Sequence, residues 1–246
     1  MKKVISFSLY GSIPMYTEGA IQNAIIAQEL FPDWKCRFYI GKGVDGQTMM
    51  KLENMKNTEI LKCGHDVENA LAMFWRFYTV YDKDVDVMIS RDVDSRLSVR
   101  EKEAIDDWLE SDKSFHIMRD HPYHDAPILG GMWGTKNTDY MRDLFQSTIQ
   151  ETLKEFRRIP SNELREKGYD QHYLWNVIYP RVVDDSIAHD PYFQTKYKNT
   201  IDFPSKRDYN DKVIFIGQVF DENENYGGDW EGDLNIIKER EGITYA

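Results

Sequence analysis

The sequence predicts an α/β fold with a central, mostly parallel sheet and helices on both faces. Apolar segments of strand length alternate with longer amphipathic segments from residue 3 to residue 118. Neighbouring parallel strands need a crossover, usually a helix, so this alternation favours a parallel sheet. A chain of 246 residues with 41% hydrophobic side chains can bury one sizeable core. We therefore expect one globular domain.

The first strand and helix show the signals used. Residues 3–10 (KVISFSLY) are apolar, and Gly11, Ser12 and Pro14 end this strand before an amphipathic stretch at residues 18–30. The same signals recur along the next part of the chain. They predict strands at residues 35–40, 59–63 and 85–90, and helices at residues 47–56 and 67–81.

The second half has a different rhythm. Ser98 and Glu101 have the spacing of a capping box, which predicts a helix to about residue 111. The elements expected next are a strand at 114–118, a glycine-rich apolar segment at 128–136, helices at 139–158 and 170–178, and short strands and loops from 186. The last stretch of about 40 residues is acidic and rich in turn residues, so we expect it to wrap the surface or form a mobile flap.

Bulk properties exclude several classes of protein. A net charge of −11 argues against binding to a nucleic-acid backbone, which favours basic surfaces. No apolar run is long enough for a transmembrane segment, and the N-terminal stretch is too polar for a secretory signal, so we expect a soluble, cytoplasmic protein. Cys36 and Cys63 lie in unrelated contexts, which predicts two buried thiols and no zinc site or disulfide.

The tripeptide Asp-Val-Asp occurs twice, at residues 84–86 and 92–94. Two carboxylates at this spacing can hold one hard divalent cation, although most such pairs are only solvated. Ligands in open α/β sheets gather beyond the carboxyl ends of the strands. The first copy enters the predicted strand at 85–90, whereas Asp92 and Asp94 follow its exit between Arg91 and Arg96. The second copy is therefore the candidate site for a metal with a bound phosphate.

A strand followed by Asp-x-Asp, in an α/β half of this kind, resembles the GT-A glycosyltransferases. Further motifs occur in the order of that family: LGGMWG (129–134) resembles its glycine-rich segment near the donor sugar and acceptor, and GYDQHYLWNVIYP (168–180) resembles the start of its DQ-containing helix. Residues 89–134 as a whole resemble glycosyltransferases of large algal (chlorella-type) viruses and bacteria. The resemblance covers roughly residues 1–220.

This resemblance implies a GT-A, Rossmann-like fold that transfers a sugar from a nucleoside diphosphate, with UDP favoured, to a glycan or glycoprotein acceptor. Residues 1–97 would bind the nucleotide sugar, and residues 98–246 would form the acceptor side with its C-terminal flap. Transfer requires the charge on the leaving diphosphate to be neutralised, which Mn²⁺ or Mg²⁺ can do. Asp94 is the expected direct metal ligand, and Asp92 is a second ligand or a partner of the donor's sugar and ribose. His189 is the expected third ligand, with Asp190 as the fallback.

Other residues receive expected roles at the donor. Asp170 begins a helix and is either a simple N-cap, the general base of an inverting enzyme or, with Gln171, a group on the reactive face of the sugar in a retaining one. Arg76 lies in an apolar helix, so its charge needs a partner, which is the donor or a structural carboxylate. Ser8 and Tyr10 end the first strand and are expected at the base or ribose, with Tyr16 as an alternative stacking platform.

The acceptor side is expected around two loops. Gly130 and Gly131 allow close approach of the backbone, and Trp133 offers a flat apolar face of the kind on which sugars stack. In RDHPYHD, Asp120 and His121 are expected to contact the sugar, with Asp120 as the alternative catalytic base.

Two other functions fit the same motif. A phosphatase of the haloacid-dehalogenase type also places Asp-x-Asp after a strand, although that motif usually stands on the first strand and here it follows the fourth. A catalytically inactive module would bind the nucleotide sugar or a glycan without turnover. Release of phosphate from small phosphoesters would indicate the first, and binding without transfer would indicate the second.

Overall fold

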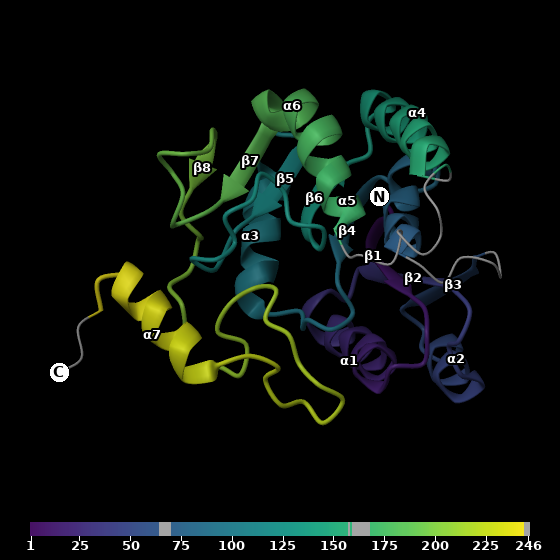
Figure 1. Cartoon of the computed structure of the whole chain (residues 1–246), viewed down its shortest axis with the longest axis horizontal. Coiled ribbons are helices and arrows are strands. Elements are labelled where there is room, and N and C mark those ends of the chain that lie inside the picture. The colour runs from purple at the N-terminus through teal and green to yellow at the C-terminus, as the bar shows by residue number, and fades with distance from the viewer. Residues whose placement is uncertain (64–69, 157, 159–167, 244–246) are drawn as a thin grey trace.

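A computed structural model describes residues 1–63, 70–156, 158 and 168–243. Its centre is an eight-stranded sheet in the order β3-β2-β1-β4-β6-β5-β7-β8 (Figure 1). Among the described strands of this sheet, β6 runs antiparallel to β4 and β5, and the other ladders are parallel. The predicted mostly parallel α/β fold is confirmed. The strands are β1 (Lys3–Leu9), β2 (Trp34–Ile40), β3 (Thr58–Lys62), β4 (Val87–Arg91), β5 (Phe115–Met118), β6 (Met132–Lys136), β7 (Ser186–His189) and β8 (Thr200–Ile201).

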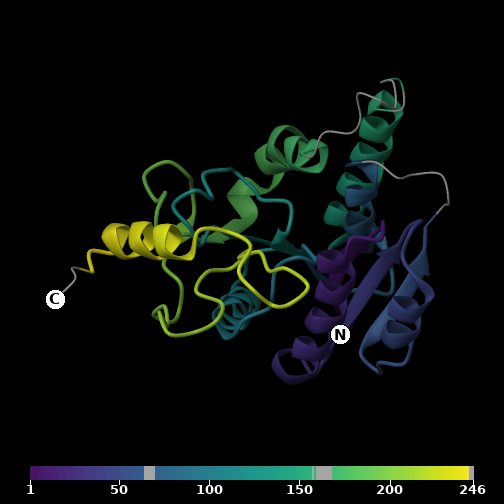
Figure 2. The same ribbon diagram turned by 60° about the horizontal axis from the view of Figure 1, so that its bottom comes forward.

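Helices cover both faces of this sheet (Figures 1 and 2). In the part of the chain that the structure describes, none of them is long and apolar enough to cross a membrane. They are α1 (Pro14–Leu30), α2 (Gly46–Glu53), the 3₁₀ helix η1 (Ala70–Tyr81), α3 (Val99–Glu110), α4 (Asp139–Phe156), α5 (Tyr169–Tyr173), the π-helical turn η2 (Leu174–Ile178), α6 (Tyr179–Val182), the 3₁₀ turn η3 (Val183–Asp185) and α7 (Trp230–Arg240).

Alternating side chains of the central strands divide the core into two layers. Val4 and Met88 belong to the layer formed with η1, α4 and α5, whereas their neighbours Ile5 and Ile89 belong to the layer formed with α1, α2 and α3. All four are completely buried. Strands that are apolar on both faces are what a parallel sheet between two helical layers requires, which explains the continuous apolar runs in β1 and β4.

The predicted start of α3 is confirmed. The Ser98 Oγ accepts a hydrogen bond from the Glu101 backbone N–H at 3.2 Å. The Glu101 side chain, however, forms an ion pair with Arg91, 3.0 Å from its Nε, instead of the reciprocal bond of a capping box. The cap therefore also places a carboxylate under the carboxyl end of β4, next to the second Asp-Val-Asp copy.

The C-terminal tail differs most from expectation. The tail contains the helix α7. Residues 214–220, which precede this helix, do not wrap the surface or form a flap, because Ile214, Ile216 and Phe220 are at most 1% exposed. The run VIFIGQVF (213–220) is apolar inside an otherwise acidic tail, which is why it packs inward. Residues 67–69 and 157 of the predicted helices lie outside the described residues.

Candidate active site

Three chain segments meet at one edge of the sheet. Strands β1 and β4 are parallel, so Leu9 and Arg91 end at the same edge. Strand β6 runs the other way and begins there, with Met132 paired to Arg91. The Asp-Val-Asp copy at residues 92–94 therefore lies beside the loop that follows β1 and the Gly130-Gly131 pair that precedes β6, whereas the copy at residues 84–86 precedes β4 and lies at the opposite edge.

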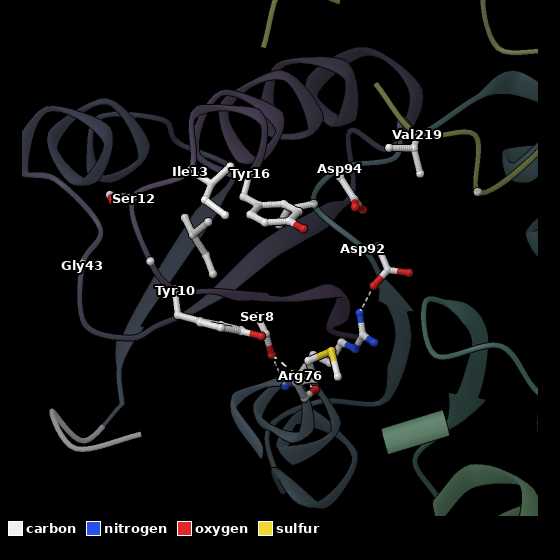
Figure 3. A pocket seen from close by; sticks show the side chains of 15 residues that line it. Ser8, Tyr10, Ser12, Ile13, Tyr16, Gly43, Arg76, Asp92, Asp94 and Val219 are labelled. Atoms are coloured by element: carbon white, nitrogen blue, oxygen red, sulfur yellow. Dashed lines mark hydrogen bonds and ion pairs between the residues drawn. The ribbon is translucent and has the colours of Figure 1, made fainter. Parts of the chain in front are cut away.

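A pocket of about 750 Å³ opens at this edge (Figure 3). The expected donor residues Ser8, Tyr10, Arg76, Asp92 and Asp94 all line it. The remaining lining residues are Leu9, Gly11, Ser12, Ile13, Tyr16, Gly43, Met73, Val93, Gly217 and Val219. A pocket of this size, with carboxylates on one side and aromatic rings on another, can hold a ligand that has both a charged and a flat apolar part.

The carboxylates of Asp92 and Asp94 face the same pocket (Figure 3). The Ser95 Oγ donates to the Asp92 carbonyl at 3.0 Å and fixes the turn that brings the two side chains together. Two carboxylates suit a hard divalent cation such as Mn²⁺ or Mg²⁺. Within the described residues no group of three or more His, Cys, Asp or Glu side chains surrounds a metal position. The residues therefore fit a cation whose other ligands come from a bound molecule or water.

Arg76 joins Asp92 to Asp170. Its Nη2 lies 2.7 Å from the Asp170 Oδ2, and its Nη1 forms an ion pair with the Asp92 Oδ1. Arg76 and Asp170 are nearly completely buried, whereas about half of the Asp92 side chain (48%) is exposed. Burial alone would lower the pKa of Arg76, but the two carboxylates outweigh it and raise that pKa. The arginine therefore stays charged and holds a buried and an accessible carboxylate together.

Gly130 and Gly131 are where the backbone approaches these charged groups most closely. A Cβ on Gly130 would stand 2.7 Å from the Arg76 Nη2 and 2.9 Å from the Asp170 Oδ2. A Cβ on Gly131 would stand 2.1 Å from the Asp92 Oδ2. Only glycine fits at these two positions without moving the ion-paired set. The predicted close approach of this backbone is thus directed at Asp92, Arg76 and Asp170.

A buried pair supports both loops from below. Arg91 donates from Nη1 to the Gly131 carbonyl at 2.7 Å and from Nη2 to the Ser95 Oγ at 3.1 Å. Its Nε lies 3.0 Å from Glu101 Oε1, and both side chains are at most 1% exposed. Burial outweighs the attraction of Arg91 and raises the pKa of Glu101 to about 7.

The other end of the pocket is uncharged. Ser8 accepts from the Arg76 backbone N–H at 3.1 Å, which attaches β1 to η1. The Tyr10 ring stands edge-on to Trp75 with ring centroids 6.2 Å apart. Tyr16 projects from α1 into the same space (Figure 3). Ser8, Tyr10 and Tyr16 thus line one uncharged end of the pocket.

Trp133 does not offer the expected flat face. Its indole is completely buried in β6 and stacks between Phe115 and Phe145, with ring centroids 5.2 Å away on each side. Its Nε1 donates to the Gly130 carbonyl at 3.1 Å. The tryptophan therefore supports the glycine pair from the core. The expectation of sugar stacking failed because alternation along β6 turns this side chain toward the helical layer.

His189 is not brought to Asp92 and Asp94. Its Nδ1 lies 2.7 Å from the His116 Nε2 and its Nε2 lies 3.1 Å from the Asp107 Oδ2. Burial lowers the pKa of His189 despite the adjacent Asp107. The fallback Asp190 is also occupied, since its carboxylate pairs with Arg119 at 3.0 Å and both are completely buried. His189 thus links β7 to β5 and α3, and Asp190 pairs with the residue that follows β5, so neither is the expected third metal ligand beside Asp92 and Asp94.

Asp120 and His121 are engaged in the fold as well. Asp120 is completely buried and lies 3.0 Å from the Arg100 Nη2 and 2.7 Å from the Arg207 Nη2. Burial opposes ionisation of Asp120, but the two arginines prevail and lower its pKa. The His121 Nε2 contacts Asp233 at 3.2 Å in α7. Arginines hold both oxygens of the Asp120 carboxylate, so neither oxygen is open to the proton of a substrate, which argues against Asp120 as the alternative base.

Gln171 follows Asp170 in α5 and is half-buried. Asp170 is in the first turn of that helix, but the N-cap is Gly168 and the Asp170 carboxylate accepts from Arg76, so the alternative of a simple N-cap is wrong. Sequence reasoning missed Gly217 and Val219 as pocket residues. The signal that could have found them is the apolar run at 213–220, which has no place in an acidic surface tail.

No family model matches the sequence, and no curated protein matches it. Solved structures similar to the chain include a glycosyltransferase involved in glycosylation of the major capsid of PBCV-1, at 15% identity and a TM-score of 0.49, with 79% of this chain and 84% of that chain covered. Another is the galactosyltransferase LgtC in complex with donor and acceptor sugar analogues, at 11% identity, a TM-score of 0.45 and coverages of 76% and 73%.

A third is the mannosyltransferase PcManGT from Pyrobaculum calidifontis in complex with GDP-Man and Mn²⁺, at 11% identity and a TM-score of 0.45. The match covers 85% of this chain and 58% of the mannosyltransferase chain. Each of these three proteins is a glycosyltransferase, and each is at most 15% identical to this chain with a TM-score below 0.5.

Proposed function

We propose that the protein is a metal-dependent glycosyltransferase that moves a sugar from a nucleoside diphosphate, with UDP favoured, to a hydroxyl of a glycan acceptor. One observation carries the proposal. Asp92 and Asp94 face a pocket of about 750 Å³ at the carboxyl edge of a parallel sheet, and Arg76 ties Asp92 to the buried Asp170 in the same corner.

The negative charges of Asp92 and Asp94 allow a diphosphate to bind in the pocket only together with a metal cation. Asp92 and Asp94 would repel two phosphates, because like charges at short range destabilise each other. Mn²⁺ or Mg²⁺ bound to both carboxylates would reverse this interaction and would stabilise charge on the diphosphate as the bond to the sugar breaks. Asp94 would hold the cation directly, and Asp92 would help to hold it while keeping its ion pair with Arg76.

The apolar and charged ends of the pocket support one orientation of the donor. The base would lie at the apolar end with Tyr10 and Tyr16, and Ser8 lies between this end and Arg76. The sugar would then point toward Asp92 and Arg76, the charged part of the pocket lining. In this proposal the anomeric carbon would lie near Asp92 and Arg76, and Asp170 is reached through its ion pair with Arg76.

Asp170 is the group proposed to decide transfer. As a general base it would take the proton of the acceptor hydroxyl, and in a retaining enzyme it would, with Gln171, stabilise positive charge on the reactive face of the sugar. Arg76 positions its carboxylate in either case. Both roles require Asp170 for the chemical step and not for binding of the nucleotide.

Isothermal titration of UDP, GDP and dTDP, each with and without Mn²⁺, tests the proposal. Wild type is expected to bind one of them with strong dependence on the metal, and Asp94→Ala is expected to lose this binding. Failure of all three nucleotides to bind would reject the proposal. Release of phosphate from small phosphoesters without any nucleotide sugar would instead support a phosphatase.

A further inference from the structure

The pocket has a wall contributed by the far end of the chain. Residues 214–220, the C-terminal wall, place Gly217 and Val219 in the pocket lining beside Asp94. The Phe220 N–H donates to the Asp94 carbonyl at 2.8 Å, and Val219 pairs with Ser95 in an antiparallel bridge. The wall is thus attached directly to the turn that carries the second Asp-Val-Asp copy.

The other end of the wall is attached to Asp120. The Ile216 N–H donates to the Asp120 Oδ2 at 2.9 Å, immediately before Gly217 enters the pocket. Arg207 contacts Asp120 Oδ1 at 2.7 Å and also bonds to the Ile214 carbonyl. The Asp120 carboxylate therefore accepts a hydrogen bond from the backbone of the wall at Ile216. It also pairs with Arg207, which binds the wall two residues earlier, at Ile214.

The conformation at this junction is specific. Gly217 has φ +90°, a left-handed conformation that favours glycine, and a Cβ there would stand 3.0 Å from the Met132 Sδ. The Gln218 side chain accepts from the Ile214 N–H at 2.8 Å and donates to the Lys212 carbonyl at 3.0 Å, so the segment turns tightly on itself. A displacement of Ile216 would therefore also move Gly217 and Val219, because the segment between them is short and its turn is closed by hydrogen bonds.

We propose that Asp120 is a positioning residue that fixes the C-terminal wall against Asp94, and thereby sets affinity for the nucleotide without touching it. The effect on nucleotide rests on the proposed function, whereas the effect on the wall does not. The carboxylate is suited to the task because it is completely buried and both of its oxygens accept from the wall or from arginines.

The chain offers a matched control in Asp190. It is also a completely buried aspartate with an arginine partner, Arg119 at 3.0 Å, and it also accepts from two backbone N–H groups, those of Tyr192 and Phe193. Its direct partners lie outside residues 214–220, and the link from them to the wall is indirect, through the Tyr192 hydroxyl that accepts from Arg207 at 3.1 Å. Asp120→Asn and Asp190→Asn should therefore both reduce thermal stability, while only the first should alter the wall and the pocket.

The test combines two measurements on both variants. Amide hydrogen exchange should become faster in residues 214–220 of Asp120→Asn and remain unchanged there in Asp190→Asn. The Kd of the nucleotide that wild type binds with Mn²⁺ should rise about 10-fold or more in Asp120→Asn only, since small displacements in a site have large effects. In the transfer reaction, the KM for the donor should rise while kcat at saturating donor changes little.

Three outcomes overturn the inference: unchanged exchange of residues 214–220 in Asp120→Asn, equal effects of both variants on Kd, or a loss confined to kcat. If wild type bound no nucleotide, the proposed function would fail, and exchange of the wall would still decide the role of Asp120. If Asp120→Asn did not fold, Arg207→Lys would replace it, because it keeps the charge but cannot hold both Asp120 and the Ile214 carbonyl.

Discussion

The two Asp-Val-Asp copies have one sequence and two different surroundings. Asp86 of the first copy accepts from the Lys2 backbone N–H at 2.6 Å, and Asp84 is exposed. Asp92 of the second copy is paired with the buried Arg76 and packed against Gly131, and Asp94 faces the pocket. The difference arises from their places before and after β4. A motif of two carboxylates acquires a site only where the sheet supplies a pocket and a counter-charge.

The largest expected effect concerns the carboxylate that shares Arg76 with the second copy. Asp170→Ala should lower the rate of transfer by about 10²- to 10⁴-fold, the usual contribution of an acid–base group. The Kd for the metal–nucleotide complex should stay close to that of wild type, because Asp92 and Asp94 are unchanged. Turnover at the wild-type rate, measured by release of UDP with acceptor present, would refute the assignment of Asp170.

Removal of the positive charge of Arg76 should mainly lower the stability of the folded protein. Arg76→Met leaves Asp170 buried without its partner, which should cost about 3–5 kcal/mol of unfolding free energy in urea denaturation. Arg37 provides a matched control near the first copy, since it bridges Glu59 and Asp82, whose side chains are 26% and 32% exposed. Arg37→Met should cost less and should spare nucleotide binding. Equal costs would show that burial of the carboxylate does not distinguish the two regions.

The pair beneath the second copy should give stability a dependence on pH. The folded state raises the pKa of Glu101 from 4.5 to about 7, so it holds the proton more tightly than the unfolded chain does. This contribution is fully present below about pH 4.5 and is lost as pH rises through about 7. The unfolding free energy of wild type minus that of Glu101→Gln should therefore fall by up to about 3 kcal/mol over this range. A difference that is constant or rises with pH would contradict the burial argument.

The smallest expected effect is steric. Gly131→Ala introduces a Cβ 2.1 Å from the Asp92 Oδ2 and 2.8 Å from the Asp92 backbone N, so that Asp92 must move. We expect a loss of about 1–3 kcal/mol in stability and weaker nucleotide binding. Gly46→Ala in α2 is the control, because nothing lies within 4 Å of its added Cβ. Tight binding by Gly131→Ala would show that the position of Asp92 is not critical.

Sequence reasoning predicted the sheet and its pocket well because both follow from local pattern. The alternation of apolar strands with helices fixes which residues end at which edge, and this placed Asp92, Asp94, Ser8 and Tyr10 in one pocket. The capping pair at Ser98 and Glu101 likewise predicted where α3 begins.

The failures share a physical cause. Trp133, His189 and Asp120 were assigned by the chemistry of their side chains, yet each is completely buried and engaged by residues distant in the sequence. Such partners depend on tertiary packing, which pattern does not encode. The contribution of residues 214–220 to the pocket was not predicted, because this apolar run lies within an acidic tail that indicates a surface segment.

The most direct test of the central claim is anomalous scattering from a crystal grown with UDP and Mn²⁺, or with the nucleotide that titration identifies. We predict a manganese peak within about 2.0–2.6 Å of a carboxylate oxygen of Asp94, bridging to the diphosphate in the pocket. A peak at Asp84 and Asp86, or nucleotide bound in the pocket with no metal beside Asp94, would contradict the claim that the second copy is the site.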